Sequence, residues 1–234
     1  MNANGGTRPG VAVLGGTGDL GFGLAGQLAR AGYSVTIGSR SAKKAELAAI
    51  DVADANPAAD VAGAANPDAA AAADIVVMTV PFSSHAATID SVRDAVQGKI
   101  FVDATVPLVP PKVMRVQMPA GGPAAKQAQE RLGEDVRVVS AFQNIAAAHL
   151  RADDLTRNEC DVLVCGNDSE ARQAVIELAE AIGLSAWHAG CIDNSAVAEA
   201  LTSVLIFLNR KYGLEGAGIR ITGGEASDCA SAAA

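Results

Sequence analysis

Three glycines near the start of the chain have the spacing of a phosphate-binding turn. Gly16, Gly18 and Gly21 fit the pattern G-x-G-x-x-G, directly after the apolar run 11–14. The first glycine of such a pattern permits a tight turn, the second lets the backbone approach a pyrophosphate, and the third lets a helix pack closely on the strand. The amino end of that helix offers unpaired N–H groups to phosphates. The pattern favours dinucleotide binding over a structural turn, and we assign it these cofactor contacts: Gly16, Thr17, Gly18, Asp19, Leu20 and Gly21.

The residues after the second predicted strand indicate which dinucleotide binds. An acidic residue there would hydrogen-bond the ribose 2′-hydroxyl of NAD. This strand instead ends in Ser39 and Arg40, and Lys44 follows one helical turn later. The planar guanidinium of Arg40 suits a 2′-phosphate, and Ser39 adds a hydroxyl donor. The alternative is an exposed cationic helix start, but the missing acid and the arginine both favour NADP.

Further candidates lie at the ends of three other predicted strands, at 79–82 with His85, at 103–108 and at 141–144. Ligands of doubly wound sheets bind beyond the carboxyl ends of the strands, so we expect these segments to meet. We assign Val80, Pro81, His85 and Ala104 to the cofactor, and Pro107, Gln143 and Asn144 to the second substrate.

Few residues in these segments are suited to acid–base chemistry, and His85 and Gln143 are the candidate catalytic residues. His85 begins a predicted helix and is placed to donate to a phosphate or a substrate; the alternative is a surface polar residue. Asp103 is expected to orient a loop. Neither tyrosine begins a Tyr-x-x-x-Lys pattern, and the sequence shows no nucleophile elbow and no metal-ligand spacing. Such a site suits direct hydride transfer between two bound cofactors, which the protein mainly positions.

Alternating apolar strands and amphipathic helices must position these residues. We predict strands at 10–15, 34–38, 74–80, 99–103, 136–142, 161–165 and 184–188, and helices at 19–31, from Ser41, 84–97, 123–132, 144–150, 170–182 and 194–212. Residues 50–73 fit either a short helix with a small strand near Val61 or mostly loop, and 219–221 fit a last short strand. The alternation predicts an α/β protein: a Rossmann-type doubly wound, mostly parallel sheet with a small C-terminal α/β lobe.

Length and composition limit the other possibilities. The 234 residues predict a Rossmann domain at 1–150, a small C-terminal domain at 151–224 and a disordered tail at 225–234. The net charge of -8 argues against nucleic acid or an anionic membrane as a partner. The four cysteines form no ligand cluster, and no apolar run reaches the ~18 residues of a membrane span. These features predict a cytoplasmic protein with free thiols.

From Val11 to about Ile221 the chain resembles the F420-dependent NADP reductases. The resemblance is clearest at 14–21, 37–40 with Lys44, 80–81, 106–108, 138–142, 161–166 and 194–224. It implies a Rossmann domain with a small C-terminal domain, a homodimer, and hydride transfer between NADPH and the deazaflavin coenzyme F420. It also implies that Thr17, Ser39, Arg40 and Lys44 surround the 2′-phosphate.

One segment departs from the family pattern. Where the family commonly has a histidine near the deazaflavin, this chain has Gln143, which forms hydrogen bonds but carries no proton near neutral pH. Two alternatives to F420 reduction therefore stay open. The first is an NADPH-dependent reductase of another small acceptor, such as a flavin, a carbonyl or an imine. The second is a non-catalytic NADP(H)-binding module.

Overall fold

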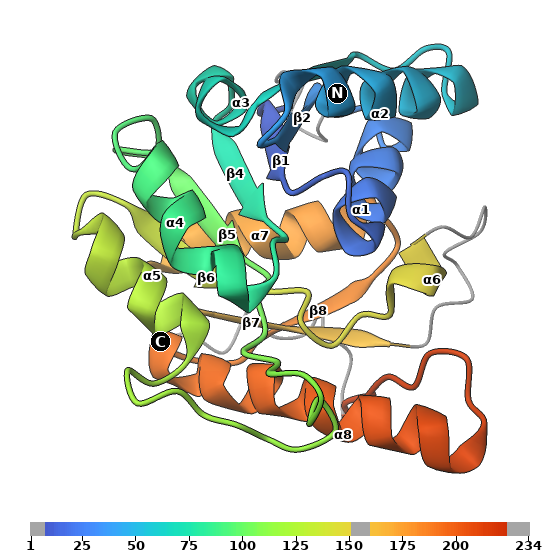
Figure 1. Cartoon of the computed structure of the whole chain (residues 1–234), viewed down its shortest axis with the longest axis vertical. Helices are drawn as coiled ribbons and strands as arrows, with labels where there is room; N and C mark the ends of the chain where they lie inside the picture. The colour runs from blue at the N-terminus through green and yellow to red at the C-terminus, as the bar shows by residue number, and fades with distance from the viewer. Residues whose placement is uncertain (1–7, 151–159, 224–234) are drawn as a thin grey trace.

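A single eight-stranded sheet runs through the molecule. The computed structural model describes residues 8–150 and 160–223. The strand order is β3-β2-β1-β4-β5-β6-β7-β8, with β1 to β6 parallel, β7 antiparallel to β6, and β8 parallel to β7 (Figure 1). The strands are β1 Val11–Leu14, β2 Val35–Ser39, β3 Val61–Ala65, β4 Ile75–Met78, β5 Ile100–Asp103, β6 Arg137–Ser140, β7 Asp161–Gly166 and β8 Ser185–His188.

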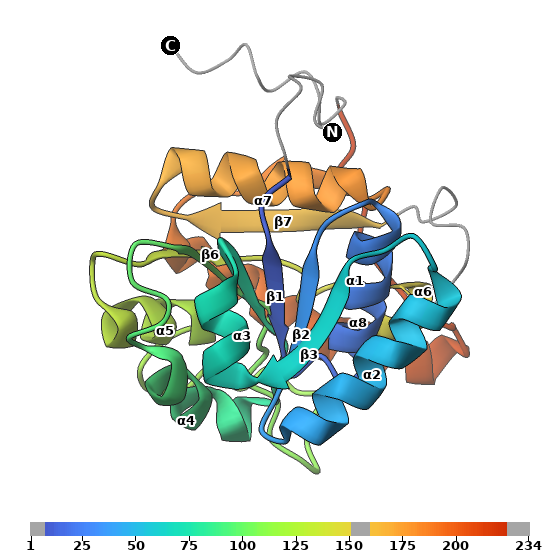
Figure 2. The same cartoon turned by 90° about the horizontal axis from the view of Figure 1, so that it is seen from above.

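Helices cover both faces of this sheet. Those described are α1 Asp19–Arg30, α2 Ala42–Ala55, α3 Asn66–Ala72, α4 Phe82–Val92, α5 Ala124–Leu132, α6 Ala147–Leu150, α7 Ser169–Ala181 and α8 Ser195–Tyr212, with the 3-10 turn η2 at Ile192–Asn194. Figure 2 shows α3, α4 and α5 on one side and α1 and α2 on the other. Helix α8 crosses beside α5, along the lower edge of Figure 1.

The core consists of two apolar layers, because side chains alternate across a buried parallel strand. In β1, Val11 and Val13 pack into the layer beneath α1, α2 and α7, whereas Ala12 and Leu14 pack into the layer beneath α3, α4 and α5. The residues of β1, β4 and β5 are all buried. These strands form a rigid base, and the loops at their carboxyl ends carry the candidate residues.

The predicted α/β doubly wound fold is confirmed. Of the two possibilities for 50–73, the structure has the one with a small strand near Val61, which is β3. Two predicted helices are wrong in extent. The helix predicted at 84–97 ends at Val92, where bonds from Ala95 and Val96 to the Val92 carbonyl turn the chain. The helix predicted at 144–150 begins only at Ala147.

Residues 219–221 form no strand. The Ile219 carbonyl accepts the N–H of Asp161 in β7 at 2.8 Å, but the Ile221 N–H donates to the Asp161 carboxylate, 2.7 Å away, so the backbone pairing does not continue. The C-terminal α/β part consists of β7, α7, β8 and α8, and β7 extends the sheet beyond β6. The predicted tail 225–234 lies outside the described residues. The domain limits stay a prediction.

Within the described ranges, no helix is both long enough and apolar enough to cross a membrane. Cys160, Cys165 and Cys191 are free thiols as predicted, whereas Cys229 lies outside those ranges. A cytoplasmic location stays a prediction from the sequence.

Candidate functional site

The glycine turn after β1 has the geometry that the spacing predicts. Gly15 has a φ of +76°, a left-handed conformation that favours glycine. A Cβ on Gly16 would lie 2.8 Å from the Val13 carbonyl oxygen, so the turn has no room for one. A Cβ on Gly18 would meet only the Gly15 carbonyl oxygen, at 3.4 Å. The space in front of Gly18 is therefore open to a ligand.

Gly21 lets α1 pack closely against the end of β4. A Cβ there would collide with Thr79 Oγ1 and would lie 2.8 Å from the Gly15 carbonyl oxygen. Gly18 is the N-cap of α1, and no side chain caps the helix there. Thr17, Gly18 and Asp19 are exposed, so the amino end of α1 is accessible at a site suited to a phosphate.

The predicted 2′-phosphate residues lie next to this turn. The N–H groups of Gly15 and Gly16 both donate to the Gly38 carbonyl, at 3.0 and 3.1 Å, which joins the turn to the end of β2. Ser39 is buried there, whereas Arg40 and Lys44 are exposed. Within the described ranges, no hydrogen bond or ion pair engages the Arg40 guanidinium, so it is available to an anion. The structure thus brings the predicted phosphate residues together.

A buried histidine–carboxylate pair lies at the ends of β4 and β5. His85 Nε2 is 2.7 Å from Asp103 Oδ2, and the two residues are 3% and 0% exposed. Asp103 Oδ1 accepts the N–H of Thr105 at 2.9 Å, so this carboxylate orients the following loop, as predicted. The alternative of a surface position for His85 is wrong, because the pair with Asp103 holds the ring inside. The Phe82 ring packs against His85, with centroids 5.7 Å apart.

Gln143 lies beside this pair, beyond the end of β6. Its Nε2 donates to the Asp103 carbonyl at 2.7 Å and is 2.8 Å from Ser140 Oγ. Its Oε1 is buried, with no partner among the residues that the structure describes. Asn144 instead joins this loop to β7, because its Nδ2 donates to the Asp161 carbonyl at 2.6 Å.

The remaining predicted residues occupy the same edge of the sheet. Thr105 Oγ1 donates to the Val80 carbonyl at 3.3 Å, which connects the loops after β4 and β5. Ala104 and Pro107 are buried in the loop after β5, whereas Pro81 is exposed at the start of α4. All of these residues follow β4, β5 or β6, and those strands pair in parallel register.

Sequence reasoning missed the polar face of α8. Thr202 Oγ1 donates to the Gln143 carbonyl at 2.8 Å, and Ser203 Oγ is 3.3 Å from the Arg115 carbonyl. One turn earlier, the Glu199 carboxylate accepts the N–H groups of Ala124 and Ala125 at 2.7 and 3.1 Å. Three polar residues within five positions, in the otherwise apolar stretch 196–208, were the available signal.

Glu199 is an unusual buried acid. Burial raises the pKa of its carboxyl to about 7, and the nearby Asp103 charge adds to the rise, while the two N–H groups of α5 oppose it. Helix α8 therefore contacts the Gln143 loop through Thr202 and the first turn of α5 through Glu199. The second contact involves an acid whose pKa is near neutral pH.

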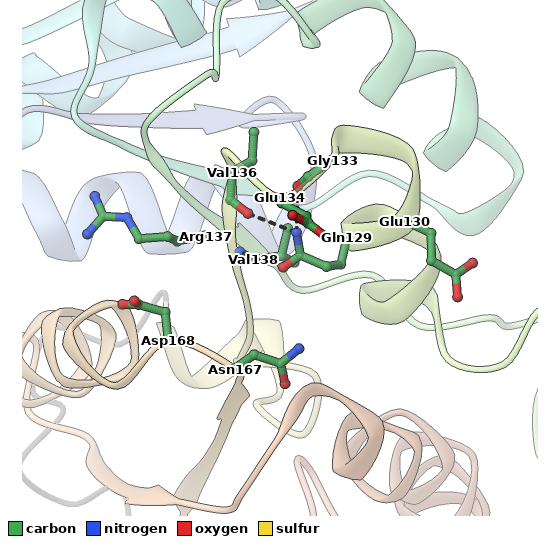
Figure 3. Close-up of a pocket in the computed structure, with 9 residues that line it drawn as sticks. All are labelled: Gln129, Glu130, Gly133, Glu134, Val136, Arg137, Val138, Asn167 and Asp168. Atoms are coloured by element: carbon green, nitrogen blue, oxygen red, sulfur yellow. Dashed lines mark hydrogen bonds between the residues drawn. The ribbon is translucent and has the colours of Figure 1, made fainter.

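A cavity of about 630 Å³ lies elsewhere, between α5, β6 and the start of α7. Arg137 and Asp168 lie on two of its walls, and Gln129 Nε2 bonds to the Val136 carbonyl at 2.9 Å (Figure 3). Because Arg137 begins β6, this cavity is at the opposite edge of the sheet from the glycine turn. It is separate from the predicted site.

Comparison with known proteins identifies the family. The family described as "NADP oxidoreductase coenzyme F420-dependent" matches residues 10–107. The chain is 43% identical to the F420-dependent NADP reductase of Methanocaldococcus jannaschii, over 91% of this chain and 97% of the relative. It is 42% identical to the enzyme of the same name from Methanothermobacter thermautotrophicus, over 91% and 94%.

The fold agrees with this similarity. A crystal structure assigned as an F420-dependent NADP reductase of Arthrobacter sp. FB24 matches with a TM-score of 0.77 and 30% identity, covering 92% of this chain and all of the other. The identities above 40% span nearly the full length of this chain and of its relatives. The chain therefore belongs to the F420-dependent NADP reductase family.

Proposed function

We propose that this protein transfers a hydride between NADP(H) and coenzyme F420. The observation that carries the proposal is the similarity, over nearly the full length, to relatives named F420-dependent NADP reductase. The geometry at the ends of β1 and β2 supports the NADP half, because an open glycine turn adjoins an available arginine.

The residues present fit an NADP molecule laid across the ends of the strands. The space in front of Gly18 would take the pyrophosphate, and Arg40 would take the 2′-phosphate, with Thr17, Ser39 and Lys44 around it. Val80, Pro81, His85 and Ala104 would flank the nicotinamide. When bound, NADP(H) and F420 supply the hydride donor and the hydride acceptor.

The task of the protein is then to orient two flat rings and to exclude water. The bond between His85 and Asp103 fixes the floor of this region, and Thr105 and Gln143 are anchored to Asp103. The deazaflavin would take up one proton with each hydride to reach its neutral reduced form, and that proton would come from solvent, so hydride transfer requires no acid–base residue of the protein. The buried polar groups of the site agree with this positioning role, because His85 and Gln143 are already hydrogen-bonded to Asp103.

The direct test mixes the purified protein with NADPH and F420 and follows the loss of deazaflavin absorbance. Rapid loss supports the proposal. Turnover with a flavin, a carbonyl or an imine, without turnover of F420, would instead identify a different reductase. Tight NADPH binding without turnover of any acceptor would identify a binding module.

Arg40→Ala is expected to weaken NADPH binding by about 1.5–3 kcal/mol, the range for a charge-assisted hydrogen bond. NADH binding should hardly change, because NADH lacks the 2′-phosphate. Calorimetric titration of both nucleotides measures the two affinities. Arg93→Ala, at another exposed arginine just beyond α4, is the matched control and should leave both affinities unchanged. Equal losses for NADPH and NADH would show that Arg40 does not read the 2′-phosphate.

The protein is also proposed to act as a homodimer, which the family resemblance implies. Val197, Val204 and Phe207 are exposed apolar residues on α8, and Val116 and Met118 are exposed in the loop that Ser203 contacts. A second copy of this chain would cover these residues, since an apolar face of this kind suits association.

Light scattering after gel filtration should therefore give twice the chain mass of 23.5 kDa. Phe207→Glu combined with Val204→Glu should yield a monomer, because both charges would have to be buried in the interface. Leu47→Glu, at an exposed apolar residue of α2, should leave the dimer intact. A monomeric wild-type protein at tens of micromolar would contradict the proposal.

A further inference from the structure

We propose that Gln143 Oε1 is a fixed hydrogen-bond acceptor for an amide or imide N–H on a ligand ring. Such an N–H is carried by the nicotinamide carboxamide and by the pyrimidinedione ring of a deazaflavin. The inference rests on the proposed function and assigns a role to this chain's own glutamine.

The orientation of the Gln143 amide follows from its partners. Its nitrogen lies 2.7 Å from the Asp103 backbone carbonyl, an atom that only accepts. A flipped amide would place two oxygens against each other at that distance. The same nitrogen uses its second N–H toward Ser140 Oγ, at 2.8 Å. Both donors of Gln143 are thus occupied, and its oxygen is left as the free end.

The backbone holds this arrangement in place. Thr202 Oγ1 donates to the Gln143 carbonyl at 2.8 Å. The preceding residue, Phe142, has a φ of +72°, a conformation that a bulky side chain adopts only when its surroundings enforce it. Gln143 itself is 4% exposed. The side chain cannot turn away without breaking its bonds to β5 and β6, and α8 holds the backbone that carries it.

The free oxygen therefore needs a donor from outside the described chain. Gln143 Oε1 has no partner among the described residues, and a buried acceptor without a donor is costly. Met78 of β4 pairs with Asp103 of β5, and Asp103 pairs with Ser140 of β6. Gln143 therefore follows the strand two places from β4, at the same carboxyl edge of the sheet as Val80 and Pro81, which are assigned to the nicotinamide ring. The pyrophosphate end, at the glycine turn, is on the other side of β4. A ligand ring bearing an N–H is the group suited to this place.

The experiment compares ligands that lack the N–H with ligands that carry it, in two protein backgrounds. The 3-acetylpyridine analogue of NADP⁺ has no carboxamide N–H, and an N3-methylated deazaflavin has no imide N–H. Equilibrium dissociation constants are measured by calorimetry or fluorescence quenching, so the readout does not depend on turnover. Gln143→Met is the variant, since its unbranched side chain has a similar length and no oxygen.

Wild-type protein should bind one of the two analogues on the order of three- to tenfold more weakly than the parent ligand, the range for one neutral hydrogen bond. Gln143→Met should bind that parent ligand equally weakly and lose no further affinity for the analogue. If the acetylpyridine analogue shows this pattern, the nicotinamide carboxamide is the donor to Oε1. If the methylated deazaflavin shows it, the deazaflavin imide is the donor.

Two results would overturn the inference. In the first, wild-type protein binds both analogues as tightly as their parents, as expected if Oε1 bonds only to a water; this needs no variant to fold. In the second, each analogue loses the same factor in both backgrounds. In either case the proposed function stands if the parent ligands bind. If neither NADP⁺ nor the deazaflavin binds at all, both the inference and the proposed function fail.

Discussion

Asp103→Ala is expected to lower the free energy of unfolding by about 3–5 kcal/mol, the range for removing one partner of a buried ion pair or hydrogen-bonded pair. The carboxylate accepts from His85 Nε2 at 2.7 Å and from the Thr105 N–H at 2.9 Å, and Asp103 is fully buried. Alanine would leave both groups without a partner inside the protein. Urea denaturation of the two proteins measures the difference.

Asp103→Asn should retain most of the lost stability. The asparagine oxygen still accepts from the Thr105 N–H, and its NH₂ faces His85 Nε2. A neutral imidazole accepts at Nε2 once its proton moves to Nδ1, so the bond persists with its direction reversed. The comparison separates loss of the hydrogen bonds, which affects only alanine, from loss of charge, which affects both variants.

Asp90→Ala is the matched control. Asp90 Oδ1 is 2.6 Å from Arg131 Nε, as short as the buried pair, but both side chains of this ion pair are about half exposed. Exposed pairs contribute little because water screens them, so this variant should unfold at nearly the wild-type urea concentration. If Asp103→Ala also unfolded there, the buried pair would not be what holds the ends of β4 and β5 together.

The sequence was sufficient for the parts of the site whose chemistry is local. The glycine turn and the Ser39–Arg40 end of β2 were predicted because their spacing along the chain fixes their geometry. His85, Asp103 and Gln143 were named as residues, but their mutual bonds depend on the register of β4, β5 and β6. No single segment of the sequence indicates that register, so the sequence alone left open whether His85 is on the surface.

Close packing explains why β3 was ambiguous. Its sequence, Val-Ala-Gly-Ala-Ala, has a single branched residue and no aromatic one, although both kinds are typical of strands. The structure shows the reason, because a Cβ on Gly63 would collide with the backbone of Ala45 in α2. The small residues are required by the helix that lies against the strand. The contacts of α8 were missed for a different reason, since Glu199 and Ala124 are 75 positions apart.

The second large effect concerns Glu199 and pH. Wild-type protein should lose up to about 3 kcal/mol of stability between pH 5 and pH 8 through this one carboxyl. Its pKa is raised from 4.5 to about 7 in the folded protein, mainly by burial. Between these values the folded state binds more protons than the unfolded state, so stability falls as pH rises. The contribution is fully present below pH 4.5 and is lost as pH rises through 7.

Glu199→Gln should remove this pH dependence, because the amide does not titrate. The variant can be less stable overall, because its NH₂ group lies near the N–H groups of Ala124 and Ala125. The test therefore compares how stability changes with pH, not the absolute stability. Urea midpoints at four pH values from 5 to 8 give both slopes, and the difference between them isolates Glu199 from the other titrating groups. Glu130→Gln, at an exposed position of α5, should keep the wild-type slope.

If the urea midpoints of wild-type protein and Glu199→Gln changed with pH in parallel, the Glu199 carboxyl would be ionised from pH 5 to pH 8, stabilised by the two N–H groups of α5. A steeper wild-type curve has a consequence for the site. Ionised Glu199 faces Asp103, whose charge disfavours it, and the same helix turn carries the Thr202 bond to Gln143. Raising the pH through 7 would then keep the two bonds to α5 but place a second negative charge near Asp103, whose backbone carbonyl holds Gln143. F420 binding should weaken over the same interval.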